Sequence, residues 1–99
     1  MSAFVIVDTR IENPNAYEHY KTAARPIVER HGGVYRVRGG AMEVVENDLW
    51  MPSRIVIVEF PDMDSARAFV NSEEYAPVKV LRHRTAKCTL AIVDGLPED

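Results

Sequence analysis

The chain has 99 residues, of which 46% are hydrophobic, which suits one globular domain over residues 1–99. Twelve Lys and Arg against fifteen Asp and Glu give a net charge of -3, which argues against nucleic-acid or membrane-surface binding. No stretch reaches the roughly 20 apolar residues of a membrane span. With a lone cysteine and a start unlike a signal peptide, we expect a cytoplasmic protein.

The first elements in chain order are a strand and a helix. Residues 3–10, rich in β-branched side chains, are typical of a strand. A helix follows, with Asn13 as its N-cap, Pro14 at its first position and Gly32 as the left-handed residue just beyond its end. One face of this helix is predicted to pack inward, and it carries Tyr17, Tyr20, Ala24, Ile27, Val28 and His31.

Residues 30–40, RHGGVYRVRGG, contain two pairs of glycines. No G-x-G-x-x-G or P-loop spacing is present, so we interpret the glycines as structural. The first pair ends the helix, and the second is predicted to bend a strand between 34–38 and 41–46. Simple alternation puts Tyr35 on the face opposite Arg38. Pairing of Val44 with Val56 would then set Glu46 against Arg54 as an ion pair across the hairpin.

The second half of the chain repeats a strand, a helical region and a strand. Residues 54–60 form an apolar strand, Asp62 caps a helix that reaches Ser72, and residues 73–84 add a further helical turn or two. The last strand covers 86–95. The order is β-α-β-β-α-β, which predicts the ferredoxin-like α+β fold with a four-stranded antiparallel sheet and helices on one side.

Both faces of this sheet are predicted to be apolar, because aliphatic residues occupy consecutive positions such as Ile6 and Val7, or Ile57 and Val58. Helices cover only one face. Leaving roughly half a dozen aliphatic side chains exposed would forfeit on the order of 10 kcal/mol, comparable to the stability of a whole domain. We therefore predict a homodimer joined sheet to sheet.

Two segments, YKTAARPIVERHGGVYRVRGG and IVIVEFPDMDSARAFVNSEEYAPVKVLR, carry a resemblance to a known family. With the pattern HGG, RGG, EFP, SEEY and LR, the chain resembles domain-of-unknown-function family 1330 of the dimeric α/β-barrel superfamily over nearly its whole length. The resemblance implies the ferredoxin-like fold and a dimer whose sheets close into a barrel. It implies no single activity, because the superfamily includes cofactor-independent monooxygenases, lactone isomerases, haem enzymes and stress-response proteins.

Two residues are candidates for proton transfer. Glu59 ends a buried strand on the face of Ile55 and Ile57, where partial desolvation would suit a catalytic carboxylate. We favour the alternative of a structural carboxylate paired with an arginine. His31 lies at the end of the first helix, where it would act as a general acid or base, although a helix cap is the more common role.

Four residues are candidates for ligand binding. Arg38 would bind a carboxylate, or pair with Glu59 or Asp8. Tyr75 and Arg82, seven residues apart, would face one pocket; core packing for Tyr75 and a solvated or helix-end position for Arg82 are the alternatives. Trp50 would cover the pocket mouth or anchor the dimer.

The sequence gives little support for a metal, cofactor or nucleic-acid site. No two histidines are spaced i, i+4 and Cys88 has no partner, so we expect no metal site. We expect no cofactor, since haem follows only from the superfamily. The basic segment 79–87 is short in an acidic chain, so nucleic-acid binding is disfavoured.

The function that we predict is binding of a small polar or acidic organic molecule between helices and sheet. One alternative is a cofactor-independent enzyme, either a monooxygenase or an isomerase that transfers protons. The other is a non-catalytic interaction or stress-response module. A cavity in which charged groups converge would favour a binder or an enzyme.

Overall fold

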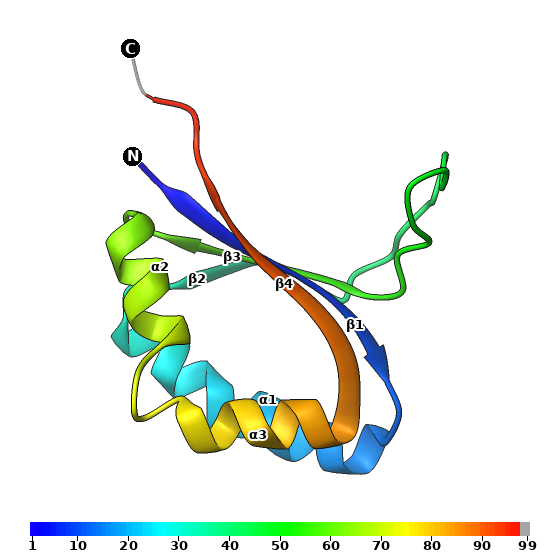
Figure 1. The fold of residues 1–99 in the computed structure, drawn as a ribbon, viewed down its shortest axis with the longest axis horizontal. Coiled ribbons are helices and arrows are strands. Elements are labelled where there is room, and N and C mark those ends of the chain that lie inside the picture. Colours follow the sequence, from blue (N-terminus) through cyan, green and yellow to red (C-terminus); the bar gives the residue numbers. More distant parts are fainter. Residues whose placement is uncertain (98–99) are drawn as a thin grey trace.

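The structure is a computed structural model that describes residues 1–97. Its sheet is antiparallel with strand order β2-β3-β1-β4, and its helices lie on one side of the sheet (Figure 1). This arrangement confirms the predicted ferredoxin-like α+β fold. The elements are β1 (Ala3–Ile11), α1 (Pro14–Arg30), β2 (Val34–Arg38), β3 (Ile55–Phe60), α2 (Met63–Val70), α3 (Ala76–Thr85) and β4 (Ala86–Asp94).

The helix ends follow local signals in the sequence. The Asn13 side chain accepts a hydrogen bond from the backbone N–H of Ala16 at 3.1 Å, which satisfies one of the free donors at the start of α1. Asp62 caps α2 in the same way through the N–H of Ser65. Gly32 has a φ of +84°, the left-handed conformation expected just after a helix. These predicted caps are confirmed.

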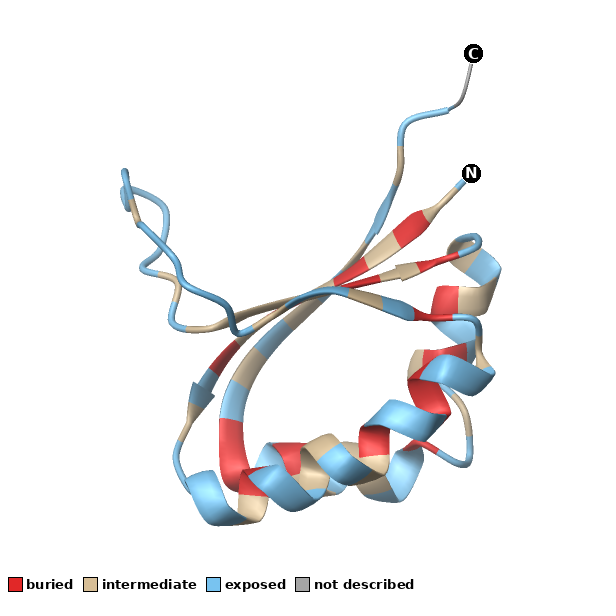
Figure 2. Cartoon of the chain, turned by 180° about the vertical axis from the view of Figure 1, so that it is seen from behind, coloured by how far each residue is buried: buried red, intermediate tan, exposed pale blue. Residues whose placement is uncertain are grey.

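The core lies between the helices and the inner face of the sheet, where buried and less buried residues alternate along β1 (Figure 2). Phe60, Phe69 and Tyr75 form its aromatic part, with ring centroids 5.5 Å apart for the first two and 4.4 Å apart for the last two. Each of the three is at most 4% exposed. This cluster holds α2, and the turn that leads into α3, against β3.

Strand β2 contains a bulge that the sequence did not predict. Its register shifts between Tyr35 and Val37, so Arg38 pairs with Val56, a residue that packs against the core. A bulge inserts one residue and reverses which face the following side chains occupy. The prediction that Arg38 and Tyr35 lie on opposite faces is therefore wrong. The Arg38 guanidinium lies 4.6 Å from the centroid of the Tyr35 ring.

The predicted strand at 41–46 is also wrong, because residues 39–54 form an irregular loop that projects away from the helices (Figure 1). Gly39 has a φ of +69° and turns the chain out of the sheet. Since Val56 pairs with Arg38, the predicted pairing of Val44 with Val56, and the Glu46–Arg54 ion pair that depended on it, does not form.

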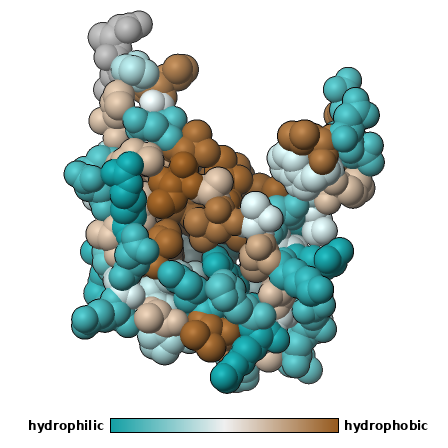
Figure 3. Space-filling model, in the orientation of Figure 1, coloured by the Kyte–Doolittle hydropathy of each residue, from teal (hydrophilic) through white to brown (hydrophobic). Residues whose placement is uncertain are grey.

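The second face of the sheet, which we call the outer face, is not covered by a helix. Its residues alternate with the core residues of each strand, and its centre is the cross-strand pair Ile6 and Ile57. Apolar side chains gather in a hollow between the loop 39–54 and the ends of β1 and β4 (Figure 3). The outer face and this loop expose Val34, Val37, Met42, Val45, Leu49, Trp50, Met51 and Val93.

No helix within residues 1–97 is both long enough and apolar enough to span a membrane.

Candidate functional site

A small cavity lies between the helices and the inner face of the sheet. Its volume is about 40 Å³, which is room for about three water molecules. The floor is apolar and comes from β1 and β3, whereas α1, β2, α3 and the last residue of the loop 39–54 supply the polar walls. The lining residues are Val7, Tyr17, Tyr20, Lys21, Ala24, Tyr35, Arg38, Arg54, Val56 and Arg82.

The cavity is strongly cationic. Its lining includes three arginines, Arg38, Arg54 and Arg82, and none of the Asp or Glu residues within 1–97. In the part of the chain that the structure describes, none of the three arginines is in an ion pair. Converging cations without a carboxylate partner attract an anion, and the attraction strengthens in a partly desolvated site.

Arg82 is the most buried of the three arginines, at 6% exposure. Its Nε and Nη1 atoms are buried and have no hydrogen-bond acceptor, and its Nη2 contacts only Nε2 of His83 at 3.2 Å. A buried guanidinium without acceptors is costly, and such groups are uncommon in folded proteins. The solvated position considered for Arg82 is therefore wrong, whereas the helix-end position is correct, because Arg82 lies in the last turn of α3. The side chain carries unused donors next to the cavity.

Two tyrosine hydroxyls lie close to Arg82. The hydroxyl of Tyr20, which lines the cavity, is hydrogen-bonded to that of Tyr75 at 2.7 Å. Burial, together with the Tyr75 hydroxyl, raises the pKa of Tyr20 far above its ordinary value. Burial also raises the pKa of Tyr75, against the lowering effect of the Tyr20 hydrogen bond and of Arg82. Both hydroxyls are therefore protonated near neutral pH and are hydrogen-bond donors.

Arg38 and Arg54 lie together at the other side of the cavity. Arg38 donates to the carbonyl of Lys21 at 3.4 Å, and Arg54 donates from Nη1 to the Tyr17 hydroxyl at 3.4 Å. A Cβ atom on Gly39 would lie only 2.5 Å from the Arg54 Nε atom, so the absence of a side chain at Gly39 makes room for this guanidinium. Arg38 does not pair with Glu59 or Asp8.

An open groove on the surface of α1 lies beside the cavity. Lys21 and Arg38 line both spaces, so the groove leads to the side of the cavity where Arg38 lies. Lys21 also forms an exposed ion pair with Glu18 at 3.2 Å, which neutralises part of its charge. A ligand from solvent would reach the cavity past Lys21 and Arg38.

Glu59 does not line this cavity, because it faces the opposite side of the sheet. Its carboxylate accepts hydrogen bonds from the Ser2 hydroxyl at 2.5 Å and from Arg36 Nε at 3.0 Å. These two donors lower the pKa of Glu59 below its ordinary value. The ion pair with an arginine that we favoured for Glu59 is confirmed. The expectation that Glu59 shares a pocket with Arg38 and Arg82 is wrong.

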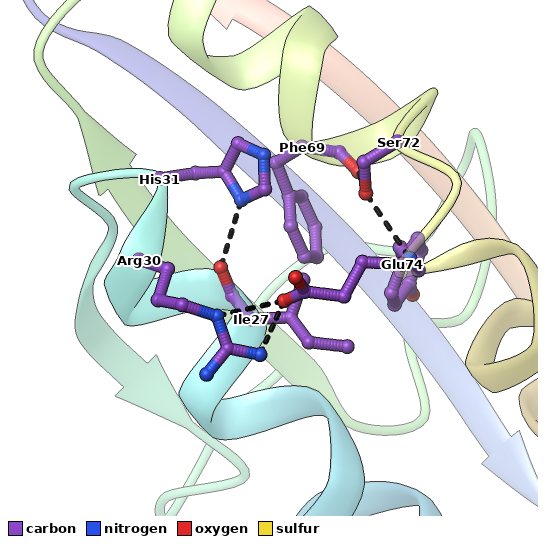
Figure 4. A network of polar contacts seen from close by, with 7 residues as sticks. Ile27, Arg30, His31, Phe69, Ser72 and Glu74 are labelled. Atoms are coloured by element: carbon purple, nitrogen blue, oxygen red, sulfur yellow. Dashed lines mark hydrogen bonds and ion pairs between the residues drawn. The ribbon is translucent and has the colours of Figure 1, made fainter.

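His31 directly follows the C-terminal end of α1, where its ring lies beside Ile27 and Phe69 (Figure 4). Its Nδ1 atom is 2.9 Å from the carbonyl oxygen of Ile27, and its ring packs edge-on to Phe69 with centroids 5.9 Å apart. Beside it, Arg30 donates from Nε to Glu74 at 2.8 Å. His31 does not line the cavity, and its proposed role in proton transfer stays a prediction.

Trp50 lies in the loop 39–54 and is held against the outer face, not over the cavity. Its indole Nε1 donates to Asp8 at 2.9 Å, and the backbone N–H groups of Ser53 and Arg54 donate to the other oxygen of the same carboxylate at 2.9 and 3.1 Å. Asp8 therefore fixes the end of the loop at the point where Arg54 turns its side chain toward the cavity.

The hydrogen bonds to Asp8 make a pH-dependent contribution to the stability of the folded state. The fluorescence of Trp50, the one tryptophan in the chain, can be used to follow the contact. Burial raises the pKa of Asp8, but the donors of Ser53, Arg54 and Trp50 outweigh it and the net pKa is lowered from 3.8. The stabilisation is fully present above pH 3.8 and is lost as the pH falls through the lower folded-state pKa. We expect the Trp50 fluorescence spectrum to be constant down to pH 3.8 and to change below it.

The substitution Asp8→Asn should bring about this spectral change at neutral pH, because its amide nitrogen cannot accept a hydrogen bond and has to face either the Trp50 N–H or the backbone N–H groups of Ser53 and Arg54. Asp48→Asn, a change within the same loop, is the matched control and should leave the spectrum unaltered. An identical spectrum for Asp8→Asn and the wild type would contradict the contact.

Residues 2–96 match the family described as Domain of unknown function (DUF1330). The chain belongs to this DUF1330 family. No curated protein is detectably similar to it in sequence. The resemblance predicted from HGG, RGG and EFP is thereby confirmed.

Solved structures share the fold of this DUF1330 chain at low sequence identity. A protein of unknown function from Rhodopseudomonas palustris is 16% identical with a TM-score of 0.73, and the match covers 98% of this chain and 84% of that one. SnoaB, a cofactor-independent oxygenase from Streptomyces nogalater, is 14% identical with a TM-score of 0.68, over 98% and 94% of the two chains. An antibiotic biosynthesis monooxygenase is 17% identical with a TM-score of 0.53, over 98% and 100%.

Of the residues predicted to form the site in this DUF1330 chain, the structure brings Arg38 and Arg82 to one cavity, with Tyr75 directly behind Tyr20. Sequence reasoning did not propose Arg54 or Tyr20 as site residues. Tyr20 had a usable signal, because a tyrosine on the inward face of a helix needs a partner for its hydroxyl. Arg54 had none, since its role depends on the path of the loop 39–54.

Proposed function

We propose that this protein is a homodimer in which each subunit binds a small organic acid in the cavity between the helices and the sheet. The observation that carries the proposal is the set of three arginines that face the cavity without a carboxylate partner among residues 1–97. Arginine is well suited to carboxylate recognition because its N–H groups match the geometry of the two oxygens. The apolar floor of Val7 and Val56 suits the carbon skeleton of such a ligand.

The dimeric part of the proposal rests on the outer face. Ile6 and Ile57 at its centre are only partly exposed in the single chain, but Val34, Val37 and Val93 around them are 37 to 47% exposed. Covering a continuous apolar surface of this kind with a second copy removes it from water on both subunits at once. Trp50, held beside this face by Asp8, would anchor the partner.

A cofactor-independent enzyme is the second candidate, supported by the likeness in fold to SnoaB, which is a cofactor-independent oxygenase. The arginines would then stabilise the negative charge of an enolate or carboxylate. Glu59 and His31, the residues predicted to move a proton, do not line the cavity. Among its lining residues, Tyr17, Tyr20 and Tyr35 are the hydroxyl-bearing ones, and burial raises the pKa of both Tyr20 and Tyr35. Binding without turnover therefore fits this cavity better.

Thermal unfolding with small carboxylates tests the binding proposal. A ligand at about 100 times its dissociation constant stabilises the folded state by about 2.7 kcal/mol, which raises the Tm of a domain of this size by about 10 °C or more. We expect such a rise with acetate or propionate in the wild type, and a much smaller one in Arg82→Met.

Arg84→Met is the matched control for this experiment, because Arg84 lies on the same helix but is exposed. It should respond to the carboxylates as the wild type does. If no carboxylate shifts the wild-type Tm at constant ionic strength, or if Arg84→Met loses the response as fully as Arg82→Met, the proposed site is wrong.

A further inference from the structure

The charge of the cavity exceeds what a single carboxylate neutralises. Three guanidinium groups face it, and the adjacent Lys21 is the one lining cation that has a carboxylate partner, Glu18, among residues 1–97. A monocarboxylate would leave the excess positive charge in a confined, partly dehydrated space. Like charges held close together are costly there, so an anion with two negative charges is better matched to this lining.

The arginines also approach the cavity from two sides. Arg38 on β2, Val56 on β3 and Val7 on β1 form one row of paired residues across three neighbouring strands. With strands about 4.8 Å apart, this row places the backbones of Arg38 and Val7 about 10 Å from each other. Arg82 comes from α3, which packs against α1 and against β4, the strand beyond β1. The strands that carry the floor residues Val7 and Val56 thus lie between β2, which carries Arg38, and β4.

Arg54 belongs to the same side as Arg38. Its guanidinium lies where a side chain on Gly39 would be, and Gly39 directly follows Arg38 in the chain. The two guanidinium groups are half-buried, whereas Arg82 is buried. The cavity therefore has an inner cationic end at Arg82 and an outer cationic end at Arg38 and Arg54.

The inner end is incomplete in the structure. Two nitrogen atoms of Arg82, Nε and Nη1, have no acceptor although they are closed off from solvent. The guanidinium has to turn toward the cavity to meet an anion, and a carboxylate there would satisfy donors that otherwise remain unpaired. The Tyr20 hydroxyl beside it supplies a further polar contact.

From this charge and placement we infer that the natural ligand is a short dicarboxylate. One carboxylate binds Arg82 at the inner end and the other binds Arg38 and Arg54 at the outer end, with the carbon atoms between them on Val7 and Val56. This inference rests on the proposed binding of an organic acid and names its class.

Calorimetric titration of the purified wild-type protein with matched pairs of acids tests the inference. Oxalate is compared with acetate, and malonate with propionate, at equal carbon number and constant ionic strength, with sulfate as an inorganic dianion. We expect each dicarboxylate to bind at least about tenfold more tightly than its monocarboxylate, since a second charge-assisted contact is worth 1.4 kcal/mol or more. Sulfate should bind more weakly than malonate because it cannot reach both ends.

Variants separate the two ends of the cavity. Arg38→Met should reduce dicarboxylate affinity at least about tenfold but leave monocarboxylate affinity nearly unchanged. Arg82→Met should weaken both classes, and Arg84→Met should change neither. Arg82→Lys retains the charge in case the Met variant does not fold, and it should bind dicarboxylates more weakly than the wild type because lysine lacks the planar fork.

The outcomes distinguish the inference from the function on which it rests. Equal affinity for monocarboxylates and dicarboxylates would overturn the dicarboxylate inference and leave organic-acid binding in place. Binding of sulfate as tight as that of malonate would also overturn it. If the wild type binds none of the four acids, the dicarboxylate inference and the proposed function both fail.

Discussion

Replacing Ile57 with glutamate is expected to convert the proposed dimer to a monomer without unfolding the chain. Ile57 pairs with Ile6 on the outer face, and its own backbone neighbour on β2 is Val37. An unpaired carboxylate buried in an interface costs several kcal/mol, and a two-fold axis places two of them there. Because each 1.4 kcal/mol is a factor of ten, the dimer dissociation constant should rise at least about a thousandfold.

Light scattering during size-exclusion chromatography measures this change, and circular dichroism checks that the variant is folded. Val80→Glu is the matched control, because Val80 is 47% exposed on α3, on the helical side of the molecule. It should leave the mass unchanged. An Ile57→Glu variant that elutes with the same mass as the wild type would show that the outer face is not the dimer interface.

Phe69→Ala is expected to cause the largest loss of stability. The ring of Phe69 packs against those of Phe60, Tyr75 and His31, and the residue is 4% exposed. Truncation of a buried phenylalanine lowers the free energy of unfolding by about 3 to 5 kcal/mol, through lost burial and the cavity left behind. This is a large share of the 5 to 15 kcal/mol that is typical of a domain.

Urea unfolding followed by circular dichroism measures the effect of Phe69→Ala. The control is Val80→Ala, an exposed truncation that should change the free energy of unfolding by no more than about 0.5 kcal/mol. A Phe69→Ala variant that loses less than about 1 kcal/mol would mean that this aromatic cluster does not hold α2 in place.

Features set by local interactions were predictable from the sequence. Asn13 and Asp62 cap helices with hydrogen bonds that span three residues, and Gly32 ends α1 through its own backbone conformation. The periodicity of the strands likewise predicted which residues of β1 and β3 alternate between core and outer face. These signals depend on neighbours in sequence, so they determined the fold class without knowledge of the pairing.

The orientation of Arg38 was not predictable, because it depends on how β2 pairs with β3. The bulge at Tyr35–Val37 moves the residues after it to the other face, and no local signal marks it. Gly39 and Gly40 suggested a bulge a few residues later, where the chain instead leaves the sheet. Two of the three cavity arginines therefore depend on features that no local signal marks: Arg38 on the bulge, and Arg54 on the path of the chain after it leaves the sheet.

The prediction that Glu59 lines the cavity was wrong for a different reason. Alternation put Glu59 on the same face as Ile55 and Ile57, and that part of the prediction is confirmed by the register of β3. The helices cover the opposite face, where Val58 and Phe60 are buried. A residue that shares the outer face with Ile57 therefore could not line a pocket beneath the helices.

Sedimentation equilibrium of the wild-type protein over a dilution series tests most directly whether a second copy covers the outer face. The account predicts a species of twice the 11.2 kDa chain mass that persists at low micromolar concentration. A folded species of a single chain mass at every concentration would contradict it.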